Sequence, residues 1–138
     1  MKTRTIFALG TALALILGAF LEPAASQASS LAGTVSGTVL YSGVHDANHE
    51  VLVAAHLDPN NEPQAVVHIV GPGAYTLADL PEGTYYISAF LDLNDNGDGP
   101  ADTAEPLGWY DPNGDDNPDP ITINGGNISG IDITLTDI

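Results

Sequence analysis

The sequence contains no cysteine, and its only two basic residues, Lys2 and Arg4, lie at the N-terminus. Without cysteine, the chain cannot form the disulfide bonds that stabilise many small secreted domains. Without Lys or Arg after residue 4, it lacks the positive charge that attracts the phosphates of nucleic acids and of anionic membrane surfaces. We therefore expect neither nucleic acid nor an anionic membrane surface to be a partner.

Acidic residues, by contrast, are abundant. The chain has 18 Asp and Glu residues, and its formal net charge is −16 at pH 7. Repulsion on this scale disfavours a compact state unless cations neutralise it, either as bound divalent ions or as a high-salt medium. Bound ions would also supply the stabilisation that disulfide bonds give to other small secreted domains.

The N-terminal residues have the three-part organisation of a secretory signal peptide. The two basic residues precede an apolar run over residues 6–20, and the small residues Ser26 and Ala28 precede the expected cleavage site. The apolar run is short for a membrane span, although without cleavage it would remain as an anchor. We expect a signal peptide over 1–28, one mature domain over 29–138, and no membrane insertion after signal removal. The protein would then be extracellular: secreted, periplasmic or at the cell surface.

The rest of the chain alternates short apolar segments with turn-forming residues and shows no helical period. The clearest strand pattern is in residues 84–91, where Tyr85, Ile87, Ala89 and Leu91 share one face. Short segments at this spacing predict an all-β fold, an antiparallel sandwich of seven strands. The expected strands cover residues 34–41, 51–57, 66–70, 74–77, 84–91, 121–123 and 131–135.

The segment 92–119 is too long for an ordinary connection in a small domain. It holds eight aspartates and one glutamate and begins with DLNDNGD, the D-x-N-x-N-G opening of a calcium loop. Alternate positions of such a loop supply oxygen ligands, and its glycine permits the sharp turn. We expect Ca²⁺ to bind and order this segment. The ligands predicted for the loop are Asp92, Asn94, Asn96, Asp98 through its carbonyl or side chain, and a later acid at Asp102 or Glu105.

A second acidic cluster, DPNGDDNPD, follows at residues 111–119. Asp111, Asn113 and Asp115 are candidates either to complete the same calcium site or to hold a second ion. The same residue types favour turns through their local hydrogen bonds. A solvated acidic turn without an ion is therefore the alternative for both clusters.

Three stretches carry a resemblance to known domains: GTVSGTVLYSG, YTLADLPEGTYYISAFLDLNDNGDGPADTAEPLGWY and ITINGGNISGIDITL. They resemble secreted prealbumin-like sandwich domains, including the carboxypeptidase regulatory-like and Cna-B-like groups. The resemblance is greatest to an uncharacterised bacterial secreted family with an L-P-x-G-x-Y hairpin followed by a D-x-N-x-N-G loop. It implies that a structural hairpin is formed by Leu80, Pro81, Gly83 and Tyr85.

The sequence departs from these patterns in three places. Gly99 and Pro100 read as a two-residue insertion, so that the later acids of the family pattern fall on Asp102 and Glu105. The twelfth position of a true EF-hand loop would be Thr103 instead of Glu, so the loop is only EF-hand-like. The lysine-to-asparagine isopeptide bond of many Cna-B-like domains requires a lysine, and the mature chain has none.

The remaining motifs favour binding over catalysis. Trp109 and Tyr110 suggest a platform for stacking sugars, with packing into the core as the alternative. His45 and His49 would share a face only in a helix, and VHDANHE reads as a loop, so we expect surface histidines instead of a zinc site. With no cysteine nucleophile, no G-x-S-x-G motif, and carboxylates confined to hydrophilic loops, we expect no enzyme.

These observations predict a secreted calcium-binding structural or interaction module. Calcium would order residues 92–119, and the partner would be an extracellular polysaccharide or protein. One alternative function is a carbohydrate-binding accessory module that uses Trp109 and Tyr110. The other is an acidic, salt-adapted extracellular domain without a specific ion site.

Overall fold

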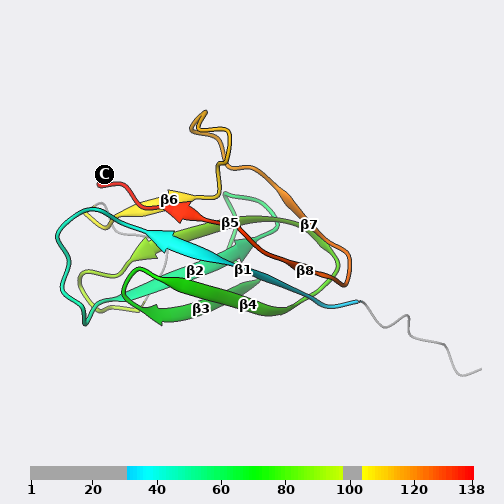
Figure 1. Cartoon of the computed structure of the whole chain (residues 1–138), viewed down its shortest axis with the longest axis horizontal. Helices are drawn as coiled ribbons and strands as arrows, with labels where there is room; N and C mark the ends of the chain where they lie inside the picture. The colour runs from blue at the N-terminus through cyan, green and yellow to red at the C-terminus, as the bar shows by residue number, and fades with distance from the viewer. Residues whose placement is uncertain (1–30, 98–103) are drawn as a thin grey trace, which may run out of the picture.

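The computed structural model describes residues 31–97 and 104–138. The expected signal peptide and two predicted ligands, Asp98 and Asp102, lie outside the described residues. Within the described ranges the secondary structure consists of strands, without a helix, and the strands form two sheets (Figure 1). The predicted all-β class and β-sandwich architecture are therefore confirmed. None of the described residues belongs to a helix long and apolar enough to span a membrane.

Each sheet is built around its longest strand, which is β1 in the first sheet and β5 in the second. The first sheet has the order β4-β1-β8, with β9 also paired to β1, and the second has the order β3-β2-β5-β6, with β7 also paired to β5. The first sheet comprises β1 (Gly33–Leu40), β4 (Ala74–Leu80), β8 (Asn127–Ile128) and β9 (Ile133–Thr134). The second comprises β2 (Glu50–His56), β3 (Ala65–Val70), β5 (Gly83–Leu91), β6 (Leu107–Trp109) and β7 (Ile121–Ile123).

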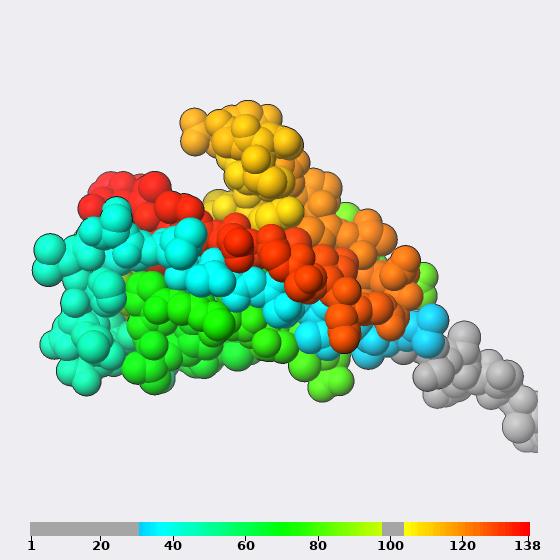
Figure 2. Space-filling model, viewed as in Figure 1, coloured from blue at the N-terminus to red at the C-terminus, as the bar shows by residue number. Residues whose placement is uncertain are grey.

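The strand pairing differs in one respect from the fully antiparallel sandwich expected from the sequence. Five pairings are antiparallel, but β1 pairs in parallel with both β8 and β9. The C-terminal segment runs parallel to β1. Figure 2 shows this segment, in red, beside the cyan residues of β1. In the described residues, β6 and β8 are strands that the sequence did not predict.

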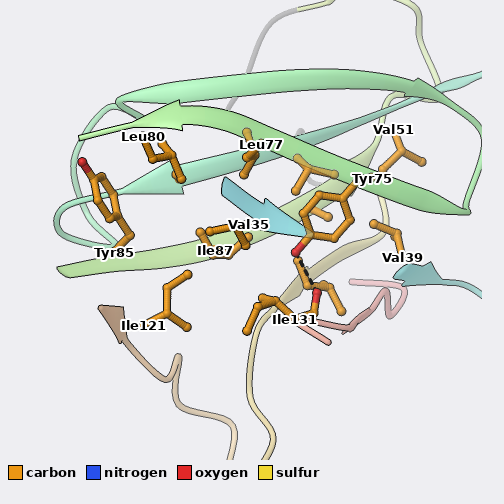
Figure 3. Close-up of a cluster of buried hydrophobic side chains, with 14 of the residues drawn as sticks. Val35, Val39, Val51, Tyr75, Leu77, Leu80, Tyr85, Ile87, Ile121 and Ile131 are labelled. Atoms are coloured by element: carbon orange, nitrogen blue, oxygen red, sulfur yellow. Dashed lines mark hydrogen bonds between the residues drawn. The ribbon is translucent and has the colours of Figure 1, made fainter. Parts of the chain in front are cut away.

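The core lies between the two sheets and is built by alternation along the strands. Val35, Val51 and Ile87 come from three different strands and are fully buried in one cluster (Figure 3). The sequence predicted that alternate residues of the strand at 84–91 share one face. This prediction is confirmed, because the core cluster includes all four of them: Tyr85, Ile87, Ala89 and Leu91. The hydroxyl of Tyr75 donates a hydrogen bond of 2.7 Å to the carbonyl of Ile131, which fixes the C-terminal segment against β4.

Two glycines permit the C-terminal segment to approach the sheets closely. A Cβ atom on Gly37 would collide with the carbonyl oxygen of Ile131, and one on Gly108 would collide with that of Thr134. Beside them, the backbones of Leu107 and Thr136 exchange hydrogen bonds of 3.1 and 3.0 Å. Since β9 also pairs with β1, this segment joins the two sheets along one side of the sandwich.

Candidate functional site

The candidate calcium loop is organised around the side chain of Asp92. Asp92 follows β5 directly and is only 2 % exposed. Its Oδ1 accepts the N–H of Asn96 at 3.2 Å, and its Oδ2 accepts the N–H of Gly97 at 2.7 Å. The backbone of Asp92 donates to the Glu50 carbonyl at 2.9 Å, which fixes the start of the loop to β2. The loop therefore folds back over a carboxylate that is held at the end of the second sheet.

The loop backbone takes the sharp turns that its sequence predicts. Asp95 and Gly97 have positive φ angles of 56° and 67°. Asp and Gly are among the residues that adopt this left-handed conformation most readily. Asn94 is exposed, and its Oδ1 accepts the N–H of Asn96 at 3.0 Å. Both asparagines thus lie in the same tight loop as the Asp92 carboxylate.

Glu105 returns to the beginning of the same loop. Its side chain is 2 % exposed, and its Oε1 accepts the N–H of Leu93 at 3.2 Å. Leu93 is the residue after Asp92, so the structure brings Asp92 and Glu105, two of the predicted ligands, to one place. Among the described residues these are the only two buried carboxylates. No Lys or Arg is available to pair with either of them, because the chain has none after residue 4.

A contact that the sequence did not reveal joins this loop to the neighbouring connection. The Nδ1 atom of His49 lies 3.1 Å from Oδ1 of Asp95, with side-chain exposures of 23 % and 67 %. Asp95 lies between the predicted ligands Asn94 and Asn96, at a position of the loop pattern that does not supply a ligand. The spacing of the motif therefore gives no indication of what Asp95 contacts. His49 thus contacts the loop from the segment that leads into β2.

The described side chains do not by themselves complete a metal centre. In residues 31–97 and 104–138, no group of three or more His, Cys, Asp or Glu side chains is arranged to hold a metal ion. Asp92 and Glu105 are a pair, and the other described candidates near them, Asn94 and Asn96, provide amide oxygens. Calcium accepts such neutral oxygens and backbone carbonyls as well as carboxylates.

The second acidic cluster forms a closed turn of its own. One carboxylate, that of Asp111, accepts backbone N–H groups from Gly114, Asp115 and Asp116 at 2.7, 3.4 and 2.9 Å. Asn113 donates through Nδ2 to Oδ2 of Asp119 at 2.7 Å. In Figures 1 and 2 this segment stands off the body of the sandwich as a separate projection. Asp111, Asn113 and Asp115 are therefore held mainly by contacts within their own turn.

The position of this turn separates it from the Asp92 loop. The N–H of Tyr110, immediately before the turn, donates to the carbonyl of Ile87 at 2.8 Å, whereas Asp92 lies beyond the far end of β5. Asp92 is five positions beyond Ile87 along the chain, which is on the order of 16 Å in an extended strand. This separation favours a second ion or an ordinary turn for residues 111–119 over a site shared with the Asp92 loop.

Trp109 and Tyr110 lie on opposite sides of the second sheet. Tyr110 packs against the hydrophobic core, whereas Trp109 lines a cavity of about 410 Å³ on the outer face. Consecutive residues of a strand point in opposite directions, so the pair does not form one stacking platform. The ring of Trp109 instead lies beside that of His56, with a centroid distance of 5.2 Å.

The four histidines contact different partners. His45 Nδ1 lies 3.3 Å from the Gly43 carbonyl oxygen, and His68 Nδ1 lies 2.9 Å from Oε2 of Glu50. The Nδ1 of His56 lies 2.9 Å from the Asn61 carbonyl oxygen and its Nε2 lies 3.0 Å from Oγ of Ser88. Sequence reasoning did not single out His56, although its place in the alternation after Leu52 and Ala54 puts it on their face of β2.

The segment that the family resemblance reads as a hairpin instead crosses from one sheet to the other, because β4 pairs with β1 whereas β5 pairs with β2, β6 and β7. The hydroxyl of Tyr85 donates to the Pro81 carbonyl at 3.0 Å, and Leu80 is 1 % exposed. No protein-family model matches the chain, and no curated protein matches its sequence. The functional interpretation therefore depends on the geometry of the sites themselves.

Proposed function

We propose that the protein is a secreted structural or interaction module in which Ca²⁺ binds at the Asp92 loop and orders residues 92–119. The observation that carries the proposal is the burial of two carboxylates at one loop: that of Asp92, and that of Glu105, which accepts the N–H of the next residue, Leu93. An ionised carboxylate is costly to bury unless a cation or several hydrogen bonds compensate it. Because the chain after residue 4 has no Lys or Arg, a bound metal ion is the natural source of that positive charge.

The chemistry of the surrounding groups favours calcium over other metals. Asn94 and Asn96 lie in the same loop as Asp92 and would contribute neutral amide oxygens as ligands. Hard oxygen ligands of mixed charge suit Ca²⁺, whereas Zn²⁺ prefers nitrogen and sulfur ligands and Mg²⁺ requires a rigid octahedron. Asp98 and Asp102 remain predicted ligands from the sequence. Calcium in this role stabilises a loop and takes no part in a reaction.

The proposal includes the resemblance to secreted prealbumin-like domains. It is supported by the two-sheet architecture and by the hydrogen bond between Tyr85 and Pro81 in the L-P-x-G-x-Y segment that connects the two sheets. The leader over residues 1–28 supports an extracellular location. The alternative is an acidic domain that requires only screening by salt. Calcium would then stabilise the fold only through its contribution to ionic strength.

Isothermal titration of Ca²⁺ into the purified protein tests the site directly. We expect saturable binding that Glu105→Gln weakens about tenfold or more, since the amide keeps an acceptor for the Leu93 N–H but loses the charge. Glu82→Gln is the matched control, because Glu82 is exposed and lies at the other end of β5 from Asp92. Equal calcium affinities in both variants, or the absence of binding, would exclude the site.

A further inference from the structure

The outer face of the second sheet carries a cavity that the calcium proposal does not use. Leu52, Ala54 and Phe90 form its floor on β2 and β5, and residues 59–63 of the connection between β2 and β3 line one side. Its volume of about 410 Å³ lies within the usual range of small-molecule sites. The cavity is therefore large enough to accept one or two rings.

One wall of the cavity is aromatic and rigid. The rings of Trp109 and His56 meet at a centroid distance of 5.2 Å with an interplanar angle of 48°. His56 is fixed by contacts at both ring nitrogens, to the Asn61 carbonyl and to the Ser88 hydroxyl. An aromatic wall that is already held in position can stack on a ligand with little further loss of side-chain freedom.

Several polar groups around the cavity are hydrogen-bond acceptors, whereas the side-chain amides of Asn60 and Asn61 and the indole N–H of Trp109 are donors. A carbonyl cannot donate, so Nδ1 of His56 carries the proton, and the Ser88 hydroxyl donates to Nε2 and keeps its own lone pairs. His68 likewise donates through Nδ1 to Glu50, which makes Nε2 of the neutral ring an acceptor. The Glu62 carboxylate, which also lines the cavity, is an acceptor as well. A ligand that both donates and accepts hydrogen bonds therefore suits the cavity.

The charge of the chain narrows the ligand class further. The described residues contain no Lys or Arg, so a phosphate or carboxylate ligand would meet no cationic group and would be repelled by Glu62. A sugar ring combines several donating hydroxyl groups with apolar C–H faces that stack on an indole. We propose that this cavity binds a neutral carbohydrate, with Trp109 as the stacking surface and with Glu62 and His68 as acceptors for its hydroxyl groups.

This proposal is independent of calcium binding, although Gly97 of the Asp92 loop also lines the cavity. Titrations in excess calcium and in chelator separate the two proposals. Saturable sugar binding in either condition supports the carbohydrate site, whatever the calcium titration shows. Failure of sugar binding in both conditions overturns the carbohydrate site and leaves the calcium site to its own test.

The single tryptophan of the chain provides the readout. Cellotriose and chitotriose serve as neutral probes with many hydroxyl donors, and choline serves as a cationic probe that can stack on an aromatic ring but carries only one hydroxyl group. We expect at least one trisaccharide to change the fluorescence of Trp109 in a saturable manner. The proposal is overturned if neither sugar has an effect at tens of millimolar, or if choline binds and the sugars do not.

Trp109 also borders a second cavity, of about 350 Å³, so variants must locate the binding. His68→Ala changes only the first cavity, and Asn117→Ala changes only the second. We expect His68→Ala to weaken sugar binding roughly tenfold through the loss of one hydrogen bond, and Asn117→Ala to have little effect. The opposite pattern would overturn the assignment. Trp109→Ala, measured by calorimetry, should abolish binding, with its circular dichroism spectrum confirming that it is folded.

Discussion

Asp92 and Glu105 show how single carboxylates can organise a loop. Each is almost completely buried. Asp92 accepts the N–H of Gly97, and Glu105 accepts the N–H of Leu93, so both carboxylates hold the chain in a folded loop. Asp92 belongs to a recognisable motif, and sequence reasoning identified it for that reason. Glu105 was one of two alternatives for the later acid, and the structure places it at Leu93.

Gly37 offers a test of the close packing at the side of the sandwich. Gly37→Ala should destabilise the protein by about 1–3 kcal/mol, because the new methyl group would collide with the Ile131 carbonyl and force the C-terminal segment outward. Urea denaturation measures the change. Gly73→Ala is the control, since a Cβ atom there meets nothing within 4 Å. Equal effects of the two substitutions would contradict the proposed packing.

At the scale of strands and loops, alternation was a reliable guide for the longer segments. It predicted the strand from 84 to 91 and the face that packs into the core, because a half-buried strand imposes a period of two on its sequence. It did not predict β6 and β8, because their sequences, LGW and NI, lack the alternation of apolar and polar residues that the equally short β7, ITI, shows. Parallel pairing with β1 was also beyond prediction, since it depends on where the C-terminal segment crosses.

The candidate sites were predictable to different degrees. The calcium motif could be read from spacing alone, because its ligands are close in sequence. The cavity beside Trp109 could not, because Leu52, His56 and Phe90 come together only when β2, β5 and β6 pair. Tyr110 was grouped with Trp109 as a neighbour in sequence, and strand geometry places the two on opposite faces.

The hydrogen bond between Tyr75 and Ile131 joins β4 to the C-terminal segment and leads to a prediction at neutral pH. Tyr75→Phe leaves the Ile131 carbonyl without this donor, so the free energy of unfolding should fall by about 1–3 kcal/mol. Tyr86→Phe is a suitable control, because Tyr86 is not part of the core cluster. Guanidinium denaturation of both variants at pH 7 gives the comparison. An unchanged midpoint for Tyr75→Phe would show that the bond contributes nothing.

The burial of Tyr75 also predicts that the protein loses stability at alkaline pH. Burial, assisted by the negative charge of Asp132 and by Tyr110, raises the pKa of Tyr75 above its ordinary value of 10.0. The folded state therefore favours the neutral phenol, and this contribution is complete below pH 10 and is lost as the pH rises above it. Melting temperatures between pH 8 and 11 should fall more steeply for the native protein than for Tyr75→Phe. Parallel curves would contradict the assignment.

For the molecule as a whole, the dominant fact is a net charge of −16 with no Lys or Arg after residue 4. Monovalent salt should stabilise the fold by screening repulsion, with a diminishing return as the Debye length falls from about 10 Å at 0.1 M to about 3 Å at 1 M. Melting temperatures across a potassium chloride series measure this effect. A melting temperature that does not change across the series would mean that the carboxylates are too dispersed to repel one another appreciably.

Specific calcium binding must appear as an addition to that screening. A ligand present at a hundredfold excess over its Kd stabilises the folded state by about 2.7 kcal/mol. For a domain of roughly this size, such an increase raises Tm by on the order of 10 °C. Magnesium should give a smaller effect, because its rigid octahedral requirement is poorly matched by a loop of amides and carboxylates.

The most direct test of the calcium proposal is the Tm of the purified protein in chelator, in millimolar Ca²⁺, and in potassium chloride of matched ionic strength, for the native sequence and for Asp92→Asn. The account predicts a calcium-specific rise on the order of 10 °C that Asp92→Asn loses. Equal melting temperatures in calcium and in matched potassium chloride would contradict it, and would show that the acidic loop interacts with cations only through screening.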